Sequence, residues 1–249
     1  MFERVKDKRV LITGASGDIG ASMSRLFASY HARVGLHYNQ GRKAAFALRE
    51  EITRHGGVAE CFQADLLLPR SAHTLMRAFL GGFHRIDILI NNAGAVIDPR
   101  DFADLTEDGW DQTLTLNAKA PCFLAQEAFR AMKRQGGGKI INISSIAAKY
   151  GGSGHTLHYG AAKAALDALT IGMARLGAPD NILVNSIRPG VIETSFHRKM
   201  GRKSLTRRVA LIPLRRAGRP TDVARAALFL ASEAGDYVTG EILTIAGGD

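Results

Sequence analysis

The fold is decided by one stretch near the start of the chain, Val10-Leu11-Ile12-Thr13-Gly14-Ala15-Ser16-Gly17-Asp18-Ile19-Gly20. A short β-branched run is typical of a strand, and here it leads through a glycine-rich turn into a segment with helical periodicity. Gly14 permits the tight turn, and Gly20 permits close approach of the helix to the strand. The start of such a helix offers N–H groups and a partial positive charge to a pyrophosphate. We therefore predict a dinucleotide-binding turn made by Gly14, Ser16, Asp18, Ile19 and Gly20.

The rest of the chain alternates short β-branched runs with longer helical stretches. Strands are predicted at residues 9–13, 33–36, 59–63, 86–91, 139–143, 182–187 and 242–245. Helices are predicted at 18–29, 42–55, 70–80, 106–135, 159–176 and 221–231, and Pro121 should kink or divide the fourth of them. Strands that are apolar on both faces belong to a parallel sheet covered by helices on each side. The prediction is a single α/β domain over residues 1–249, a Rossmann-type doubly wound seven-stranded parallel sheet.

Composition narrows the class of protein. Apolar residues make up 46 % of the 249 positions and charged residues 22 %, the balance of a globular protein. The charged start of the chain lacks the apolar run of a secretory signal, and no apolar run approaches the ~18 residues of a membrane span, so we expect a cytoplasmic protein with no membrane partner. Cys61 and Cys122 are far apart and lack metal-type spacing, which argues against a disulfide framework and a metal site.

The positive charge is concentrated in one segment. The net charge is +10, but residues 195–221 contain no Asp or Glu and many of the Lys and Arg residues. The net charge alone would be compatible with a nucleic-acid partner, but we interpret the excess as a local property of this segment and expect no such partner. The same segment is the one long stretch without a strand, so we expect a basic substrate lid at about residues 195–220. Its charges either face solvent or another subunit, or attract an anionic substrate, carrier protein or cofactor phosphate.

The stretch Tyr159-Gly160-Ala161-Ala162-Lys163 carries a phenol and an ammonium four residues apart, so on a helix they share one face. A free tyrosine has a pKa near ~10, and its use as an acid or base near neutral pH needs a shift of roughly 3 units. A neighbouring cation lowers the pKa of a phenol, so Lys163 is expected to lower that of Tyr159. Most such pairs are only surface contacts. The interpretation therefore depends on the surrounding motifs, Asn91-Asn92-Ala93-Gly94, Asn142-Ile143-Ser144-Ser145 and Pro189-Gly190.

The end of the second predicted strand distinguishes the two nicotinamide cofactors. It reads His37-Tyr38-Asn39-Gln40-Gly41-Arg42-Lys43 and holds no carboxylate that would bind the ribose of NAD and repel the extra phosphate of NADP. Arg42 and Lys43 could reach that phosphate, or they are only solvated residues of the next helix. NADP is favoured over NAD, with His37, Asn39 and Arg42 at the adenosine end. Asp65, followed by Leu66, either hydrogen-bonds the adenine or caps its own turn.

With these motifs assembled, the chain resembles the short-chain dehydrogenase/reductase family from Lys8 to Asp249. The resemblance implies that Asn117, Ser145, Tyr159 and Lys163 are the catalytic set. It also implies that Asn92, Ala93 and Gly94 stabilise the central strand beside the cofactor, and that Pro189, Gly190, Ile192 and Thr194 contact the nicotinamide. The stretches Ile212-Pro213-Leu214 and Arg219-Pro220 are similar to those of the branch that includes 3-oxoacyl carrier-protein reductases. A homotetramer is a further implication.

The chain departs from the family pattern at two places. Asp18 stands where glycine is usual in the family, and Gly17 stands where the family often has a basic residue. The carboxylate of Asp18 would lie near the cofactor phosphates, so it either points outward or weakens cofactor binding. The spacing from Ser145 to Tyr159 is one residue longer than usual, which leaves Ser144 as a minor alternative to Ser145.

Together these patterns predict an NADP-dependent oxidoreductase that interconverts a carbonyl and a secondary alcohol by hydride transfer. The favoured substrate is a 3-oxoacyl thioester, which would be anionic or held on a carrier protein. The alternative substrate is a sugar, a polyol or a small ketone. The pocket walls are expected at residues 95–99, 147–158 and 195–208, where His155 and His158 either orient a polar substrate or are merely exposed. A second alternative is a non-catalytic cofactor sensor or nucleic-acid-binding protein. The intact Ser145, Tyr159 and Lys163 oppose it.

Overall fold

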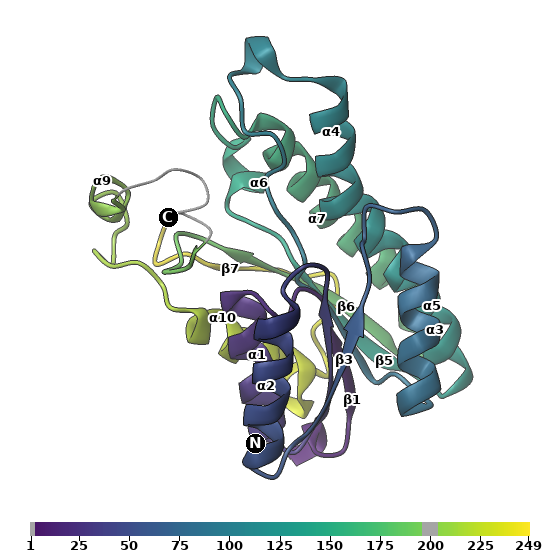
Figure 1. The fold of residues 1–249 in the computed structure, drawn as a ribbon. Helices are drawn as coiled ribbons and strands as arrows, with labels where there is room; N and C mark the ends of the chain where they lie inside the picture. The colour runs from purple at the N-terminus through teal and green to yellow at the C-terminus, as the bar shows by residue number, and fades with distance from the viewer. Residues whose placement is uncertain (1–2, 196–203) are drawn as a thin grey trace.

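Seven parallel strands form the centre of the protein. The computed structural model describes residues 3–195 and 204–249, and its sheet has the order β3-β2-β1-β4-β5-β6-β7 (Figure 1). The strands are β1 (Arg9–Ile12), β2 (Arg33–Tyr38), β3 (Val58–Gln63), β4 (Ile88–Asn91), β5 (Gly138–Ile143), β6 (Ile182–Pro189) and β7 (Ile242–Ile245). The predicted parallel seven-stranded sheet is thereby confirmed. The chain runs outward from β1 to β3 and then returns to β4 on the other side of β1. Parallel sheets bind ligands at such a reversal, beyond the carboxyl ends of the strands.

Helices cover both faces of this sheet. One face carries α1 (Asp18–Ser29), α2 (Arg42–Arg54) and α10 (Pro220–Ala231), and the other carries α3 (Ser71–Phe83), α5 (Ala120–Arg134) and α7 (Leu157–Gly177) (Figure 1). The alternation of side chains along β1 explains both layers, since Val10 and Ile12 enter the first core cluster and Leu11 enters the second. All three side chains are fully buried. Burial on both faces is why the strands read as continuous apolar runs.

Two strands run further than the sequence predicted, because neighbouring strands continue the pairing. β2 extends to Tyr38, which pairs with Gln63 of β3. β6 extends to Pro189, which pairs with Ile245 of β7. The extension places His37 and Pro189 at the carboxyl edge of the sheet, where the predicted cofactor site lies.

The fourth predicted helix is divided, as the proline indicated. Residues 106–135 form α4 (Glu107–Leu114), a π-helical turn (Thr115–Lys119) and α5, with Pro121 in the first turn of α5. A proline ring crowds the carbonyl four residues before it, which here belongs to Asn117. The wide turn removes that clash and places Asn117 in a buried position. Single π-helical turns occur mostly at functional sites.

The predicted lid at 195–220 is only partly visible, because residues 196–203 lie outside the described residues. The described part contains the short helix α9 (Thr206–Val209), and Gly218 forms an isolated parallel bridge with Ile192 after β6. Among the described helices, none is both long enough and apolar enough to cross a membrane.

A buried ion pair connects α7 to the sheet. Asp167 of α7 is 5 % exposed and accepts a hydrogen bond from Arg188 Nη2 at 2.7 Å and another from Ser186 Oγ at 3.0 Å. Both partners belong to β6. The pair therefore joins the helix that carries Tyr159 and Lys163 to the sheet.

We predict that Asp167→Asn lowers the free energy of unfolding by about 3–5 kcal/mol, because it leaves a largely buried guanidinium without its carboxylate. Urea denaturation measures the loss. The matched control is Glu51→Gln, which removes the half-exposed pair with Arg25 and should cost below about 1 kcal/mol. Equal losses in the two variants would contradict the assignment of a structural role to the buried pair.

Candidate active site

A cavity of about 700 Å³ opens at the carboxyl ends of the strands. It brings together nearly all the residues that the sequence assigned to the cofactor and to catalysis. The predicted residues that line it are Gly14, Ser16, Asp18, Ile19, Gly20, His37, Asn39, Asp65, Leu66, Asn92, Ala93, Gly94, Ser145, Tyr159, Lys163, Pro189, Gly190, Ile192 and Thr194. Arg42 and Asn117 are not part of its lining. No cluster of three or more metal-binding side chains occurs in the part of the chain that the structure describes.

The glycine turn after β1 has the shape that a dinucleotide requires. Gly14 has a φ of +65°, and a Cβ atom added to Gly20 would collide with the carbonyl oxygen of Gly14. The turn is held from the end of β4, because the Asn92 side chain donates to the carbonyl of Thr13 at 2.8 Å and to that of Gly14 at 3.3 Å. The Thr13 hydroxyl in turn accepts from the backbone N–H groups of Asn92 and Ala93 at 2.9 Å. These residues fit a bound pyrophosphate at the start of α1.

His37 holds the same turn from the other side. Its ring is 2 % exposed, accepts a hydrogen bond from Gly14 N at 3.0 Å through Nδ1, and donates to the Ala64 carbonyl at 3.1 Å through Nε2. These two partners require the neutral ring with the proton on Nε2. Burial lowers the pKa of His37 to about 4. Sequence analysis placed His37 at the cofactor but did not predict this supporting role.

The lowered pKa makes stability depend on pH. The folded protein binds a proton at His37 less readily than the unfolded chain, so this residue stabilises the fold fully above pH 6.5 and loses the contribution as pH falls towards 4. The loss should reach about 3 kcal/mol. We predict that the stability difference between wild type and His37→Gln, measured by urea denaturation, shrinks over this range. His55→Gln at an exposed histidine is the control, and a pH-independent difference for His37→Gln would contradict the prediction.

Asp18 is turned towards the loop after β6. Its Oδ2 atom accepts hydrogen bonds from Ser195 N at 2.8 Å and from Ser195 Oγ at 2.7 Å. Asp18 begins α1, while Gly17 before it contributes no side-chain cap. The unusual carboxylate therefore connects the glycine turn to the start of the segment that follows β6.

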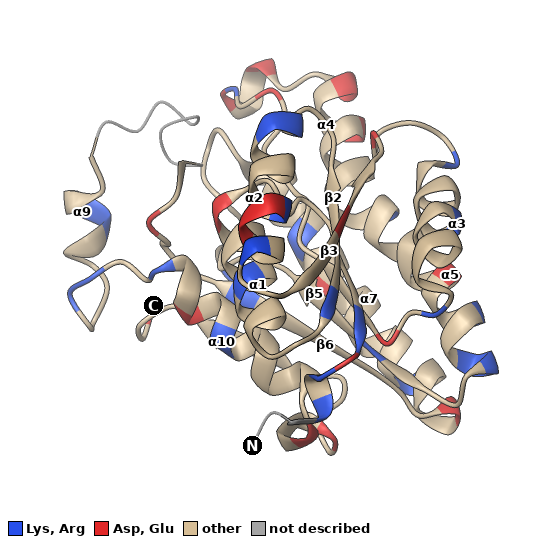
Figure 2. Cartoon of the chain, turned by 60° about the horizontal axis from the view of Figure 1, so that its bottom comes forward, with Lys and Arg blue, Asp and Glu red and all other residues tan. Residues whose placement is uncertain are grey.

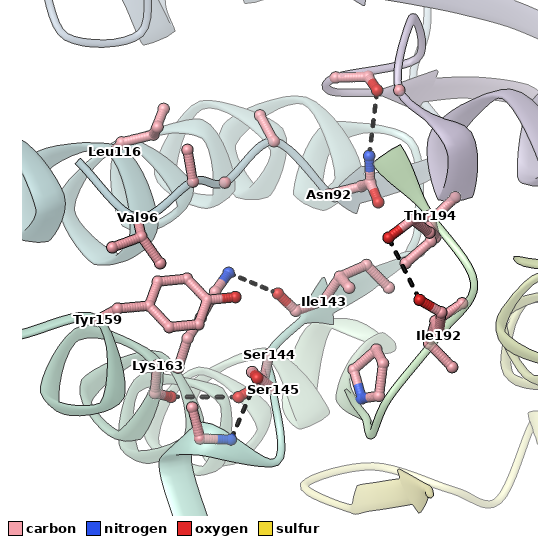
Figure 3. Close-up of a pocket in the computed structure, with 18 of the residues that line it drawn as sticks. Asn92, Val96, Leu116, Ile143, Ser144, Ser145, Tyr159, Lys163, Ile192 and Thr194 are labelled. Carbon is pink, nitrogen blue, oxygen red and sulfur yellow. Dashed lines mark hydrogen bonds between the residues drawn. The ribbon is translucent and has the colours of Figure 1, made fainter. Parts of the chain in front are cut away.

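Tyr159, Ser145 and Lys163 converge in the cavity (Figure 3). The Ser145 hydroxyl is hydrogen-bonded to the Tyr159 phenol and accepts from Ala147 N at 3.1 Å. Ser144, the alternative, instead donates to the Lys163 carbonyl at 3.2 Å. The Lys163 Nζ atom lies 5.7 Å from the centre of the Tyr159 ring and donates to the Ile143 carbonyl at 2.8 Å.

The predicted lowering of the Tyr159 pKa is wrong for this structure. Burial raises the pKa of the phenol to about 12, and the hydrogen bond with Ser145 opposes that rise only in part. Burial also lowers the pKa of Lys163 to about 8, against the raising effect of Asp167. The reason is desolvation, which penalises the charged form of each group, because Lys163 is buried and Tyr159 is partly buried in the cavity. At neutral pH Tyr159 is therefore a protonated acid.

Asn117 lies behind the cavity wall. Its side-chain nitrogen donates to the carbonyls of Ala95 and Thr113 at 2.8 Å. Its Oδ1 atom is buried and has no hydrogen-bond partner among the described residues. A Cβ atom added to Gly94 would meet this oxygen at 2.6 Å and Lys163 Nζ at 3.1 Å, so only glycine fits between them.

Three predicted residues lie away from the cavity. Arg42 is exposed at the start of α2 and stacks on Phe46, with 5.3 Å from its guanidinium carbon to the ring centre. His155 pairs with Asp101 on the surface at 3.2 Å. His158 is buried and its Nε2 bonds the Ile97 carbonyl at 2.8 Å. Neither histidine lines the cavity.

The cavity lining also contains residues that sequence analysis did not single out. They include Gln40, Leu67, Leu116, Ile143 and Val191. Leu116 directly precedes the predicted residue Asn117, and Val191 directly follows the predicted residue Gly190. This adjacency was the only signal for them in the sequence. The predicted walls at 95–99, 147–158 and 195–208 contribute Val96, Tyr150, Arg208 and others to the lining.

The chain matches known proteins over almost its full length. A family model described as "Enoyl-(Acyl carrier protein) reductase" matches residues 14–249. The 3-oxoacyl-[acyl-carrier-protein] reductase FabG of Chlamydia pneumoniae is 36 % identical over 244 residues, covering 97 % of this chain and 96 % of that protein. The L-rhamnose 1-dehydrogenase (NAD(P)(+)) of Azotobacter vinelandii is 37 % identical over 248 residues, covering 97 % and 96 %.

A solved structure also matches the chain over almost its full length. The 7α-hydroxysteroid dehydrogenase in complex with NADH and 7-oxo glycochenodeoxycholic acid has a TM-score of 0.92 and 33 % sequence identity, covering 98 % of this chain and 94 % of that one. The glycine turn, the Ser145–Tyr159–Lys163 group and these matches lead to one conclusion: the chain belongs to the short-chain dehydrogenase/reductase family of NAD(P)-dependent oxidoreductases, which act on hydroxyl and carbonyl groups.

Proposed function

We propose that this protein is an NADP-dependent oxidoreductase that interconverts a carbonyl and a secondary alcohol. The observation that supports this most directly is the phenol of Tyr159, hydrogen-bonded to Ser145 in the same cavity as the glycine turn. When bound, the nicotinamide ring supplies the hydride chemistry. The turn from Gly14 to Gly20 would hold its pyrophosphate, and the residues from Pro189 to Thr194 would hold the ring.

The chain's own residues would manage the proton. Tyr159, protonated at neutral pH, donates its proton to the oxygen of the carbonyl as negative charge grows there. Ser145 donates a hydrogen bond to the same oxygen and stabilises that charge. In the reverse direction Tyr159 must first lose its proton, which its raised pKa makes harder at neutral pH. Lys163 would bind the nicotinamide ribose.

Asn117 fits a role in proton supply. In the part of the chain that the structure describes, its buried Oδ1 atom has no hydrogen-bond partner, and it lies beside Gly94 as Lys163 Nζ does. A buried acceptor of this kind is normally satisfied by an ordered water. A water held there would connect Lys163 to solvent after each proton transfer.

We predict that Tyr159→Phe lowers kcat for carbonyl reduction by about 10²- to 10⁴-fold, because the proton donor is lost. The dissociation constant for NADPH, measured by fluorescence titration, should stay unchanged. Tyr150→Phe is the matched control, since this half-exposed tyrosine lines the same cavity. Retained turnover in Tyr159→Phe would refute the assignment.

The choice of NADP rests on the end of β2. The sequence from His37 to Lys43 contains no carboxylate, and the cavity is lined there by Asn39 and Gln40. Arg42, at the start of the next helix α2, is exposed and stacks on the ring of Phe46. Arg49 stacks on the same ring, with 4.7 Å from its guanidinium carbon to the ring centre. An exposed guanidinium at this point can turn to a 2′-phosphate at little cost.

We predict tighter binding of NADPH than of NADH, with Arg42→Ala weakening NADPH binding about tenfold and leaving NADH binding unchanged. Arg49→Ala is the control for loss of stacking on Phe46. Fluorescence titration of the wild type and of both variants with each cofactor measures the six affinities. An equal or higher affinity for NADH in the wild type would overturn the NADP assignment.

For the substrate we propose a 3-oxoacyl thioester first and a sugar, polyol or small ketone second. The similar proteins support both, since one is a carrier-protein reductase and another is a sugar dehydrogenase. A panel of these compounds with NADPH distinguishes them. A homotetrameric assembly, a cytoplasmic location and a single domain with a basic lid at about 195–220 stay predictions, as does the absence of nucleic-acid and membrane partners.

A further inference from the structure

We propose that Arg208 is a specificity-determining residue that binds an anionic group of the substrate, so that the preferred substrate is a carbonyl compound with an apolar body and a carboxylate or phosphate. This inference rests on the proposed function. Arg208 belongs to α9, lines the cavity that holds Tyr159, and is neither fully buried nor fully exposed. Lys163 and Arg208 are the Lys and Arg residues of the described chain that line this cavity.

Helix α9 is held in place by apolar contacts on one side. Leu205 and Val209 pack against the small buried cluster of Val191, Ile212 and Ala217. Residues three and four apart share a face of a helix, so Arg208 lies beside that packed face and reaches the cavity. Arg207, two residues after Leu205, is exposed and does not line the cavity. The arginines of α9 are Arg207 and Arg208, and arginine positions are blue on the ribbon of Figure 2.

Nothing in the described chain neutralises Arg208. No ion pair involves its side chain in the described residues, and residues 195–221 contain no Asp or Glu that could supply one. Of the carboxylates that line the cavity, Asp18 accepts hydrogen bonds from Ser195, and Asp65 accepts one from Leu67 N at 3.0 Å. The ammonium of Lys163 donates to the Ile143 carbonyl. Arg208 is therefore the cation of this cavity that is available to an anion.

The remaining walls indicate what accompanies the anionic group. The loops after β4, β5 and β6 contribute the apolar side chains of Val96, Ile97, Ile146, Tyr150 and Val191 and the hydroxyls of Ser144, Ser145, Ser153, Thr156, Thr194 and Ser195. The hydroxyls of Ser144, Thr194 and Ser195 already donate to the Lys163 carbonyl, the Ile192 carbonyl and the Asp18 carboxylate. The hydroxyl of Thr156 already accepts from Ser153 N at 2.9 Å. A sugar would need many more polar partners, because each hydroxyl left unpaired in such a site costs affinity. An acyl chain or apolar ring with one acidic group fits better.

The test uses a series of oxocarboxylates with increasing distance between carbonyl and carboxylate, each paired with its methyl ester. We expect wild type to prefer the acid over the ester by about 10- to 100-fold in kcat/KM at the best length. Arg208→Gln should abolish that preference, while Arg208→Lys retains part of it. Arg207→Gln, which removes the same charge from the exposed side of α9, should leave the preference intact.

Two further measurements separate the possible failures. The oxocarboxylate's dissociation constant from the protein–NADPH complex, measured by calorimetry, should rise about 10- to 100-fold in Arg208→Gln. If Arg208→Gln instead weakens NADPH binding and leaves the acid–ester ratio unchanged, Arg208 serves a cofactor phosphate and the inference fails. If wild type reduces esters as well as acids, the inference fails while the proposed function stands. If no carbonyl compound turns over although NADPH binds, the proposed function itself fails.

Discussion

The site depends on one backbone turn that is held from both sides. Gly14 adopts a left-handed conformation after β1, and the peptide groups around it are bonded to His37 at the end of β2 and to Asn92 after β4. Strand order places β2 and β4 on either side of β1, so these contacts exist only because the chain reverses there. The same reversal opens the cavity at the carboxyl ends of the strands, where the start of α1 can meet a phosphate.

Burial sets the chemistry of the acid–base group. Tyr159 and Lys163 share a face of α7, where Lys163 is buried and Tyr159 is partly buried in the cavity beside Ser145. Desolvation keeps the phenol protonated and weakens the ammonium, so the resting group suits donation of a proton more than its removal. Asn117 lies in the π-helical turn before Pro121, and its buried Oδ1 atom has no hydrogen-bond partner among the described residues.

The cavity lining contains both a carboxylate, Asp18, and a guanidinium, Arg208. Asp18 would lie close to the phosphates of a bound dinucleotide, but its hydrogen bonds from Ser195 turn the carboxylate towards the segment after β6. That segment carries most of the local positive charge, and Arg208 brings one guanidinium from it to the cavity lining.

The sequence alone predicted the parallel sheet, its two helical layers and the glycine turn, because strand and helix periods and turn chemistry are local properties. The family resemblance added the prediction that Ser145, Tyr159 and Lys163 form the catalytic group. The sequence could not determine the support of the turn by His37, the direction of Asp18, the position of Arg42 outside the cavity or the raised pKa of Tyr159. Each of these depends on partners far away in the chain or on exclusion of water. Only the tertiary structure brings such partners together and decides which charges are desolvated.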